Sequence, residues 1–379
     1  MKKQPYITGK LNRRDFLRIL LAASGAATLS PLLNACQGLG LITPTQTPTL
    51  LATPSASSTS TLSPSLTSSP SPTATPDPRT PVVFVKTRDR VAGIRKALKL
   101  WGQNPVGGKT VALKANFNSA NLSPASTHPD TLRTLVQELW GMGARSLTLA
   151  ERSGSADTRS VLTELGIFDL AAELGVDIVV LNDLLDQSNW DMIQPPGSHW
   201  QNGFPFSRIF REAEAVVQTC CLKPHQSGAI TLSLKNSVGM VGRYVNGLDH
   251  DYMSEMHASN IGTKVAEINF AYTPSLILLD GVEAFITGGP DQGQKVWGDV
   301  ILVGADRVAI DAVGVALLRT LGCTGPASRG PIFQQEQIAR AVELGLGVDR
   351  PEKIHLLVDA DDIESQAYAM LVQNQLMRE

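Results

Sequence analysis

Short apolar runs alternate with longer segments of helical periodicity from residue 82 to the end of the chain. This alternation is typical of βαβ units. We therefore expect an α/β fold with a mainly parallel sheet flanked by helices in a Rossmann-like three-layer arrangement, built as one large domain or as two lobes. The apolar runs predict strands at residues 82–86, 110–115, 146–150, 177–181, 215–222, 275–279, 299–303 and 353–358. The helical pattern predicts helices at residues 91–101, 129–142, 158–165, 254–271, 306–321, 333–344 and 363–376.

One long interval, residues 182–207, fits neither the strand period nor the helix period. It contains two tryptophans and several prolines. A long irregular segment in a compact domain is more often functional than idle, so we interpret it as a loop or lid.

The first 36 residues have the composition of an export signal. Six Lys or Arg residues, including the pair Arg13-Arg14, precede or flank a short apolar run. The paired arginines followed by Phe16 and Leu17 look like a twin-arginine signal, and the apolar run is too short to span a membrane. The end of the segment resembles a lipoprotein processing site, with Cys36 as the lipidated residue. An uncleaved N-terminal anchor is the alternative.

Residues 37–80 predict a disordered tether. Of the 38 residues from 43 to 80, 28 are Ser, Thr or Pro. Such a segment cannot bury enough apolar surface to offset the entropy of ordering. We expect residues 81–379 to form the folded domain, exported and held to the outer face of the cytoplasmic membrane by the N-terminal lipid.

The charge distribution argues against binding to nucleic acid. Residues 1–36 carry six basic side chains and one Asp, which leaves 27 basic and 34 acidic side chains in residues 37–379. Binding to phosphate backbones requires an excess of cations on one face, so we expect no nucleic-acid partner.

The four cysteines are too few and too scattered for a disulfide framework or a ligated cluster. Cys220 and Cys221 are adjacent in an apolar run, which predicts two thiols on a buried strand. A strained vicinal disulfide or a metal-ligand role are the alternatives.

The strongest candidate for chemistry is the stretch from residue 215 to residue 240. The apolar run ends in Lys223 and His225, and Lys235 and Asn236 follow inside another apolar segment. An unpaired ammonium in a dry core costs several kcal/mol. We therefore expect a crevice lined with cations that meets an acidic group, either a protein carboxylate or an anionic ligand.

Other predicted strands also end in polar residues. Ligands of open α/β sheets bind outside the carboxyl ends of the strands, so these residues are candidates for the rim of the same pocket. Ordinary solvated loop residues are the simpler alternative. The candidates are Lys114, Asn116, His128, Glu151 and Asp280.

Asp311 lies on the apolar stripe of a predicted helix, together with Val308, Val315 and Leu318. A buried carboxylate should have a cation nearby, and Lys114, Lys223 or Lys235 could supply it. Asp306 is instead explained as the cap of that helix.

Two further segments are weaker candidates. Gly288 and Gly289 could let the backbone approach a phosphate or carboxylate, although a plain turn explains them as well. His250 and His257, with carboxylates between them, could bind a metal, but a polar helix start is the simpler interpretation, so we predict no metal site. No cofactor motif occurs in the sequence, and the cofactor stays open.

From about residue 82 to residue 347 the chain resembles the family named domain of unknown function 362 (DUF362). The segments that carry the resemblance are Leu113–Asn116, Thr127–Pro129, Leu222–His225, Leu234–Gly239, Asp280-Gly281, Gly288–Pro290 and Asp306–Ala312. Members typically have Lys and Thr where this chain has Cys221 and Pro224. They usually show Gly-Asp-Ser after the third strand, where Ala150-Glu151-Arg152 intervenes here. Many relatives also carry ferredoxin-type cysteine clusters. Because this chain lacks those cysteines, we expect no iron–sulfur cluster.

Three functions remain open. The first is an exported enzyme acting on a small carboxylate or phosphate, in which Lys114, Lys223 and Lys235 bind the substrate. His225 or His128 would then be the general acid or base with a pKa near the working pH, and Asp280 or Asp311 would orient a lysine. The second is a tethered solute-binding protein that uses the same cations without catalysis. The third is a degenerate scaffold of the cell envelope.

Overall fold

The computed structural model describes residues 77–154, 156–226 and 229–378. The predicted signal segment, the lipidation site Cys36 and nearly all of the predicted tether lie outside these residues. Among the helices that are described, none has both the length and the apolar character needed to cross a bilayer.

A single nine-stranded sheet runs through the centre of the folded part, in the order β11-β1-β10-β9-β7-β2-β3-β4, with β8 paired to β7. The strands β7, β2, β3 and β4 are parallel neighbours, as are β9 and β7, and β1 and β11. Only β10 runs against both of its neighbours, and β8 runs against β7. The prediction of a mainly parallel sheet is therefore confirmed. The strands of this sheet are β1 (Thr80–Lys86), β2 (Thr110–Lys114), β3 (Ser146–Glu151), β4 (Asp177–Val180), β7 (Ala215–His225), β8 (Ala229–Thr231), β9 (Leu276–Phe285), β10 (Lys295–Gly304) and β11 (Ile354–Leu357).

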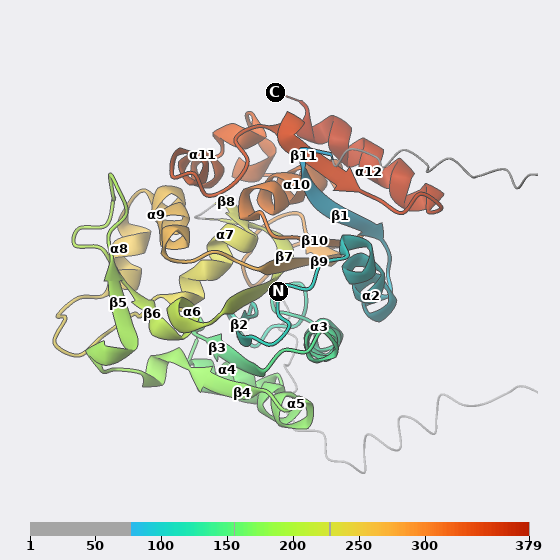
Figure 1. Ribbon diagram of the computed structural model, residues 1–379. Helices are drawn as coiled ribbons and strands as arrows, with labels where there is room; N and C mark the ends of the chain where they lie inside the picture. The colour runs from blue at the N-terminus through green and yellow to red at the C-terminus, as the bar shows by residue number, and fades with distance from the viewer. Residues whose placement is uncertain (1–76, 155, 227–228, 379) are drawn as a thin grey trace, which may run out of the picture. The chain divides into compact units, whose positions relative to one another are not determined.

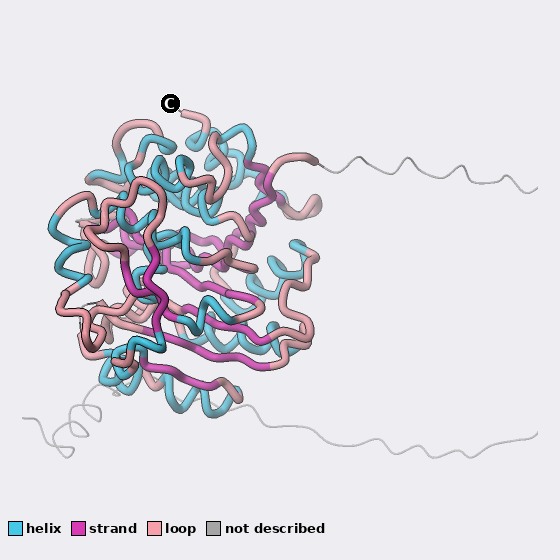
Figure 2. The backbone as a smooth tube through the Cα atoms, turned by 60° about the vertical axis from the view of Figure 1, so that its left-hand side comes forward, coloured by secondary structure: helices cyan, strands magenta, loops and turns pink. Residues whose placement is uncertain are grey.

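Helices cover both faces of the sheet, which gives the expected three layers (Figures 1 and 2). Alternate side chains of β1 face opposite layers, because successive residues of a strand point to opposite sides. Val83 and Val85 belong to an apolar cluster that also contains residues of α2 (Arg90–Trp101), α3 (Pro129–Gly141), α4 (Thr158–Glu164) and α5 (Ile167–Leu174). Val82 and Phe84 belong to a second apolar cluster on the other face, which contains residues of α10 (Arg307–Thr320), α11 (Glu336–Glu343) and α12 (Ile363–Leu376).

The helix predicted at residues 254–271 is two helices, α8 (Tyr252–Ala258) and α9 (Ile261–Ile268). Asn260 between them has a φ of 51°, in the left-handed region, which interrupts the helical path. Three short helices were not predicted: α5, α6 (Arg208–Glu212) and α7 (Ser233–Asn236). The last two have five and four residues, too few to show a helical period.

Residues 182–207 are not an open lid. They include a hairpin of β5 (Trp190–Ile193) and β6 (Phe204–Ser207), and Trp190, Trp200 and Phe204 are buried in a third apolar cluster. The buried carboxylate of Glu267 on α9 holds this segment in place, because it accepts hydrogen bonds from the backbone of His199 and from Arg340. Contacts group all described residues of the fold into one compact unit rather than two lobes.

Candidate functional site

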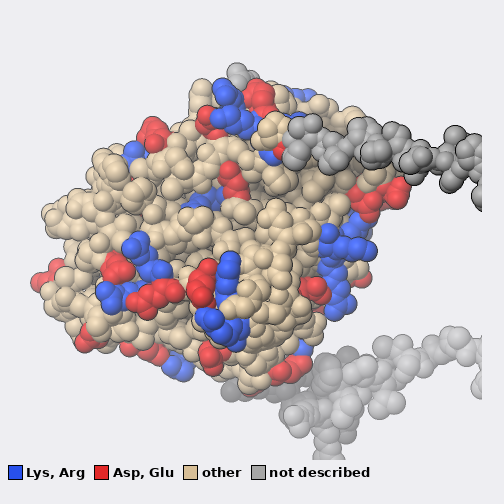
Figure 3. All heavy atoms as spheres, viewed as in Figure 1, with Lys and Arg blue, Asp and Glu red and all other residues tan. Residues whose placement is uncertain are grey.

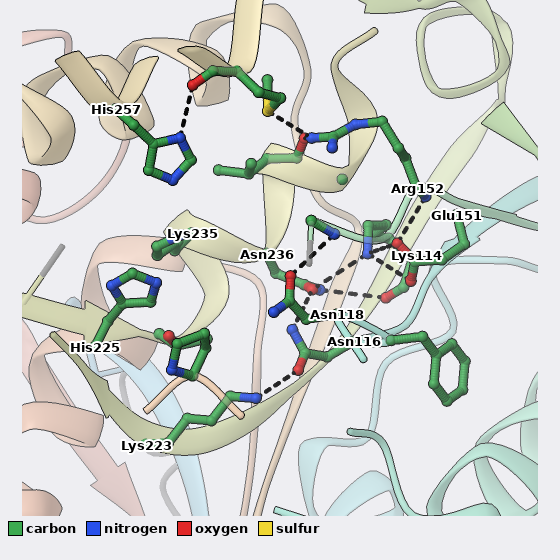
Figure 4. A pocket seen from close by; sticks show the side chains of 17 residues that line it. Lys114, Asn116, Asn118, Glu151, Arg152, Lys223, His225, Lys235, Asn236 and His257 are labelled. Carbon is green, nitrogen blue, oxygen red and sulfur yellow. Dashed lines mark hydrogen bonds and ion pairs between the residues drawn. The ribbon is translucent and has the colours of Figure 1, made fainter. Parts of the chain in front are cut away.

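A pocket of about 120 Å³ opens at the carboxyl ends of β2, β3 and β7 (Figure 4). This is the edge of the sheet at which parallel α/β folds bind their ligands. The volume has room for several water molecules, and so for a ligand of a similar number of heavy atoms. Its lining residues are Lys114, Asn116, Phe117, Asn118, Glu151, Arg152, Gly154, Lys223, His225, Thr231, Lys235, Asn236, Val238, Gly239, Met253, His257 and Pro290.

The β7–β8 hairpin supplies one wall of the pocket. Lys223 and His225 are two residues apart on β7, so both side chains leave the same face of the strand. Thr231 on β8 is the antiparallel partner of Lys223, and directly opposed residues in such a pair share a face. This geometry brings a hydroxyl beside the two predicted residues. The sequence did not reveal β8, because a three-residue strand has no visible period.

The short helix α7 supplies Lys235 and Asn236, and Asp311 fixes where it begins. The carboxylate of Asp311 accepts hydrogen bonds from the backbone amides of Ser233 (2.8 Å) and Leu234 (3.1 Å). Burial raises the pKa of Asp311 to about 7, although these backbone hydrogen bonds favour the ionised form. Asp311 does not line the pocket, and its hydrogen-bond and ion-pair partners in the described structure include no lysine. The predicted lysine partner is therefore wrong, because backbone amides satisfy this carboxylate instead.

The floor of the pocket is a connected polar network. The Lys114 ammonium lies 2.6 Å from the Glu151 carboxylate, and both side chains are buried. Asn236 donates from its amide to the carbonyls of Lys114 and Thr219. Its amide oxygen accepts from Asn116 at 3.3 Å. These contacts bring together Lys114, Asn116 and Glu151, which lie at or just after two strand ends, and Asn236, which comes from the stretch 215–240.

Lys223 reaches the same network from the other side. Its ammonium donates to the amide oxygen of Asn116 at 2.9 Å and to the carbonyl of Ala125. The side chain is fully buried, and burial lowers the pKa of Lys223. Within the described residues no carboxylate forms an ion pair with it.

Arg152 is the most informative residue that the sequence analysis missed. Its buried guanidinium donates to the carbonyls of Val238 and Val241, both at 2.6 Å, and contacts the sulfur of Met253. Burial lowers the pKa of Arg152 to about 10. It therefore holds the segment after α7, η3 (Ser237–Met240), against the end of β3. The available signals were its position immediately after Glu151 and its departure from the Gly-Asp-Ser that the family usually shows there.

Lys235, His225 and His257 lie on the opposite side of the pocket from the polar floor (Figure 4). The Lys235 ammonium makes no hydrogen bond or ion pair with any residue that the structure describes. Burial, reinforced by the nearby charges of Lys223 and Arg152, lowers its pKa to about 8. His257 donates from Nδ1 to the Met253 carbonyl at 2.7 Å, because a carbonyl oxygen can only accept.

His225 is in the pocket as predicted, but its protonation differs from the prediction. Burial, together with the charges of Lys235, His257 and Lys223, lowers the pKa of His225 to about 3. We expected a pKa near the working pH. Burial first, and then the neighbouring cations, whose positions the sequence could not give, keep the imidazole neutral near pH 7.

His128 and Asp280 do not line the pocket. His128 caps α3, with its Nδ1 accepting from the Asp130 amide at 3.1 Å, and burial lowers its pKa. Asp280 accepts from Arg90 at 2.9 Å and from Thr131 at 2.6 Å. The expectation that Asp280 orients a lysine is wrong, because an arginine from α2 takes that place.

Gly288 and Gly289 serve the backbone rather than the pocket lining. Both have positive φ values, 67° and 80°. A Cβ on Gly289 would lie 2.0 Å from the carbonyl oxygen of Pro224, so only glycine fits there. This close approach brings the neighbouring Pro290 into the pocket wall. A direct ligand contact by the two glycines remains a prediction.

Metal ligands do not gather anywhere in the described part of the chain: no group of three His, Cys, Asp or Glu side chains could hold an ion. His250 pairs with Glu255 at 2.6 Å, whereas His257 bonds to a carbonyl. Cys220 and Cys221 are free, buried thiols on β7, as the apolar run predicted.

The fold and the site define an α/β protein with a doubly covered, mainly parallel sheet and a lysine-lined pocket at the carboxyl ends of its strands. The chain belongs to the family described as Domain of unknown function (DUF362), which matches residues 111–316, more than half of its length. The matched region includes β3, β7, α7 and all of β2 except Thr110, and therefore the residues of the pocket floor.

Two named proteins are similar to this chain. The thylakoid-associated protein sll1697 of Synechocystis sp. is 23% identical over 252 residues, which is 65% of this chain and 74% of that protein. The solved structure of the lactate racemase apoprotein from Thermoanaerobacterium thermosaccharolyticum is 11% identical, covers 81% of this chain and 93% of that chain, and has a TM-score of 0.35. A similarity this low carries no argument about function.

Proposed function

We propose that the pocket binds a small anion, a carboxylate or a phosphate, and that the protein is an enzyme acting on it. The observation that carries the proposal is the charge imbalance of the lining. Four cations line the pocket, Lys114, Lys223, Lys235 and Arg152, whereas Glu151 is the only carboxylate among the lining residues. Elsewhere the visible surface shows acidic and basic side chains side by side (Figure 3).

The imbalance has an energetic consequence. A buried charge without a counter-charge costs several kcal/mol, and part of this cost appears as the lowered pKa of Lys223 and Lys235. A bound anion supplies the missing counter-charge, so binding relieves the cost. The same argument excludes a cation as the natural ligand, because it would add to the repulsion.

The lining residues then divide by role. Lys223 and Lys235 contact the anion, and Lys235 is the group able to gain or lose a proton near neutral pH, because its pKa is about 8. The neutral imidazole of His225 acts as a hydrogen-bond partner rather than as a charged group. Lys114, Glu151 and Asn236 hold the floor in position.

Isothermal titration calorimetry of the full chain with phosphate and acetate tests the binding step. We expect heat of binding for at least one anion, and a large loss of affinity in Lys235→Gln. The matched control is Lys99→Gln, an exposed lysine of α2, which should bind as the wild type does. Binding of neither anion, or equal losses in both variants, contradicts the proposal.

A binding protein without catalysis is the second candidate, and the pKa of His225 favours it. A histidine with a pKa of about 3 is not protonated at neutral pH, so it is a poor general acid there. Native mass spectrometry of protein from its own host can identify a co-purified anion. Conversion of that compound by the purified protein, with loss of conversion in His225→Gln, supports the enzyme. An unchanged compound that still binds supports the solute-binding protein.

The location is part of the proposal. We propose that the protein is exported and anchored to the outer face of the cytoplasmic membrane through a lipid on Cys36, with residues 37–80 as a tether. The basic segment, the short apolar run and the Ser/Thr/Pro-rich stretch support this, and the Synechocystis relative is named a thylakoid-associated protein. Palmitate labelling and membrane fractionation test it, because Cys36→Ala should abolish the label and release the protein. A labelled Cys36→Ala variant contradicts it.

A further inference from the structure

The hydroxyl of Thr231 has no hydrogen-bond partner in the described structure, although it is buried. Thr231 is 4% exposed and lines the pocket. Its Oγ1 is one of six buried side-chain nitrogen or oxygen atoms that have no hydrogen-bond partner among the described residues. A buried hydroxyl without a partner costs free energy unless a ligand satisfies it. This hydroxyl is independent of the lysine charges, and it points to a ligand in the same pocket.

Three of the residues that line the pocket have side-chain donors that no described residue uses: Lys223, Thr231 and Lys235. Lys223 has three N–H groups and uses two of them, on Asn116 and on Ala125. Lys235 uses none of its three side-chain N–H groups on a described residue, and Thr231 keeps its O–H. Lys223 and Thr231 are paired across the β7–β8 hairpin. Lys235 lies four residues after Thr231 in the sequence. The remaining donors suit a group with several terminal oxygens.

The formal charge indicates how negative that group is. The described lining residues include four basic side chains, those of Lys114, Lys223, Lys235 and Arg152, and one acidic side chain, that of Glu151. Asp291 lies near enough to favour the charged forms of Lys223 and Lys235, and it accepts a hydrogen bond from Asn118 at 2.8 Å. Counting Asp291, two positive charges remain. A dianion neutralises them, whereas a monocarboxylate leaves one uncompensated.

We propose that Lys223, Thr231 and Lys235 form a subsite for a dianionic phosphoryl group. This inference rests on the proposed function, because it names the class of anion that the pocket takes. The donors of Lys223, Lys235 and Thr231 contact its terminal oxygens, since charge-assisted hydrogen bonds from ammonium groups are the strong ones. The group belongs either to free inorganic phosphate or to a phosphate monoester.

Calorimetric titration of the full chain with inorganic phosphate, methyl phosphate and acetate tests the subsite. At about pH 7.5 a phosphate monoester is almost entirely dianionic, and the dianion is the majority form of inorganic phosphate. We expect inorganic phosphate or methyl phosphate to bind about tenfold more tightly than acetate, or better. Tighter binding of methyl phosphate identifies an ester as the ligand class, and tighter binding of inorganic phosphate identifies the free ion. Both results support the subsite.

Thr231→Val tests the hydroxyl, and the chain offers a matched control. Thr219 also has a buried hydroxyl without a described partner, but it does not line the pocket. Thr231→Val should weaken phosphate binding about tenfold, because a hydrogen bond to a charged group is lost. Thr219→Val should bind phosphate as the wild type does, and both variants should fold because valine has nearly the shape of threonine.

Three outcomes overturn these proposals in different ways. If acetate binds as tightly as phosphate, the phosphoryl assignment fails while the anion pocket survives. If Thr231→Val and Thr219→Val bind phosphate equally, Thr231 is not part of the subsite. If no anion binds to the wild type, the proposed function itself is wrong.

Discussion

Lys114 and Glu151 form a buried ion pair across two neighbouring parallel strands, with Nζ 2.6 Å from Oε1. The two residues end β2 and β3, and their side chains are only 3% and 1% exposed. Gly239 leaves the space that the pair occupies, because a Cβ there would lie 2.5 Å from Cε of Lys114. The pair therefore links two strands to the segment that follows α7, and it fixes the floor of the pocket.

Glu151→Gln should lower the free energy of unfolding by about 3 to 5 kcal/mol, because it leaves the Lys114 ammonium buried without a counter-charge. Urea denaturation at neutral pH measures the change. The double variant Lys114→Met/Glu151→Gln is the control, and it should recover much of the loss, since it removes both charges. A loss below about 1 kcal/mol in the single variant would show that the ammonium is solvated or neutral.

Lys235→Met should raise the melting temperature at neutral pH, because it removes an ammonium that burial disfavours. The pKa of Lys235 is lowered from 10.5 to about 8, so the unfolded chain binds more protons than the folded one between these values. The cost of the charge is therefore full below about pH 8, and it shrinks as the pH rises toward 10.5. Thermal unfolding of wild type and variant across this range measures the effect. A gain that persists unchanged at high pH would contradict the charge explanation.

The same titration should appear in ligand binding. Only the protonated form of Lys235 attracts an anion, so affinity should fall as the pH rises above about 8. The groups that act on Lys235 from neighbouring elements are Lys223, Arg152 and Asp291. Binding by Lys235→Met should be weak throughout and should lack the fall near pH 8.

Gly289→Ala should destabilise the fold by about 3 kcal/mol or more, because the new methyl group meets the Pro224 backbone and the positive φ is unfavourable. Gly143→Ala is the matched control. Gly143 has a φ of 81°, but a Cβ there would meet nothing within 4 Å. Its cost should be about 1 kcal/mol, from backbone strain alone. Equal costs in chemical denaturation would show that the turn moves away from Pro224.

The sequence predicted the residues on regular strands better than those on short connections. Lys114, Glu151, Lys223 and His225 all stand at the ends of strands whose apolar runs are long enough to recognise. The carboxyl ends of parallel strands meet at one edge, so their convergence followed from the fold class alone. Thr231 was missed because it lies on a three-residue strand. Arg152 was seen only as a departure from the family pattern, because its partners, the carbonyls of Val238 and Val241, come from a distant segment.

The two wrong predictions of a lysine partner, for Asp311 and for Asp280, share one cause, which is that a buried polar group can have more than one kind of partner. The helical stripe showed correctly that Asp311 is buried. It could not show that the backbone amides of Ser233 and Leu234, rather than a lysine, would satisfy it. Asp280 likewise accepts a hydrogen bond from Arg90 rather than from a lysine. Periodicity gives burial along one element, whereas partners come from elements far away in the chain.

Asp311→Asn should change how stability depends on pH. Burial raises the pKa of Asp311 from 3.8 to about 7, so the folded chain holds a proton that the unfolded chain has lost between these values. The wild type therefore loses stability as the pH rises through this range, by up to about 4 kcal/mol. The asparagine cannot ionise, so the variant should not lose this part of its free energy of unfolding as the pH rises. Urea denaturation of both proteins from about pH 4 to about pH 8 gives the difference directly, and other titrating groups cancel in it. A difference that stays constant with pH would mean that the amides of Ser233 and Leu234 keep Asp311 ionised, and that the start of α7, and with it the position of Lys235, depends on a charge.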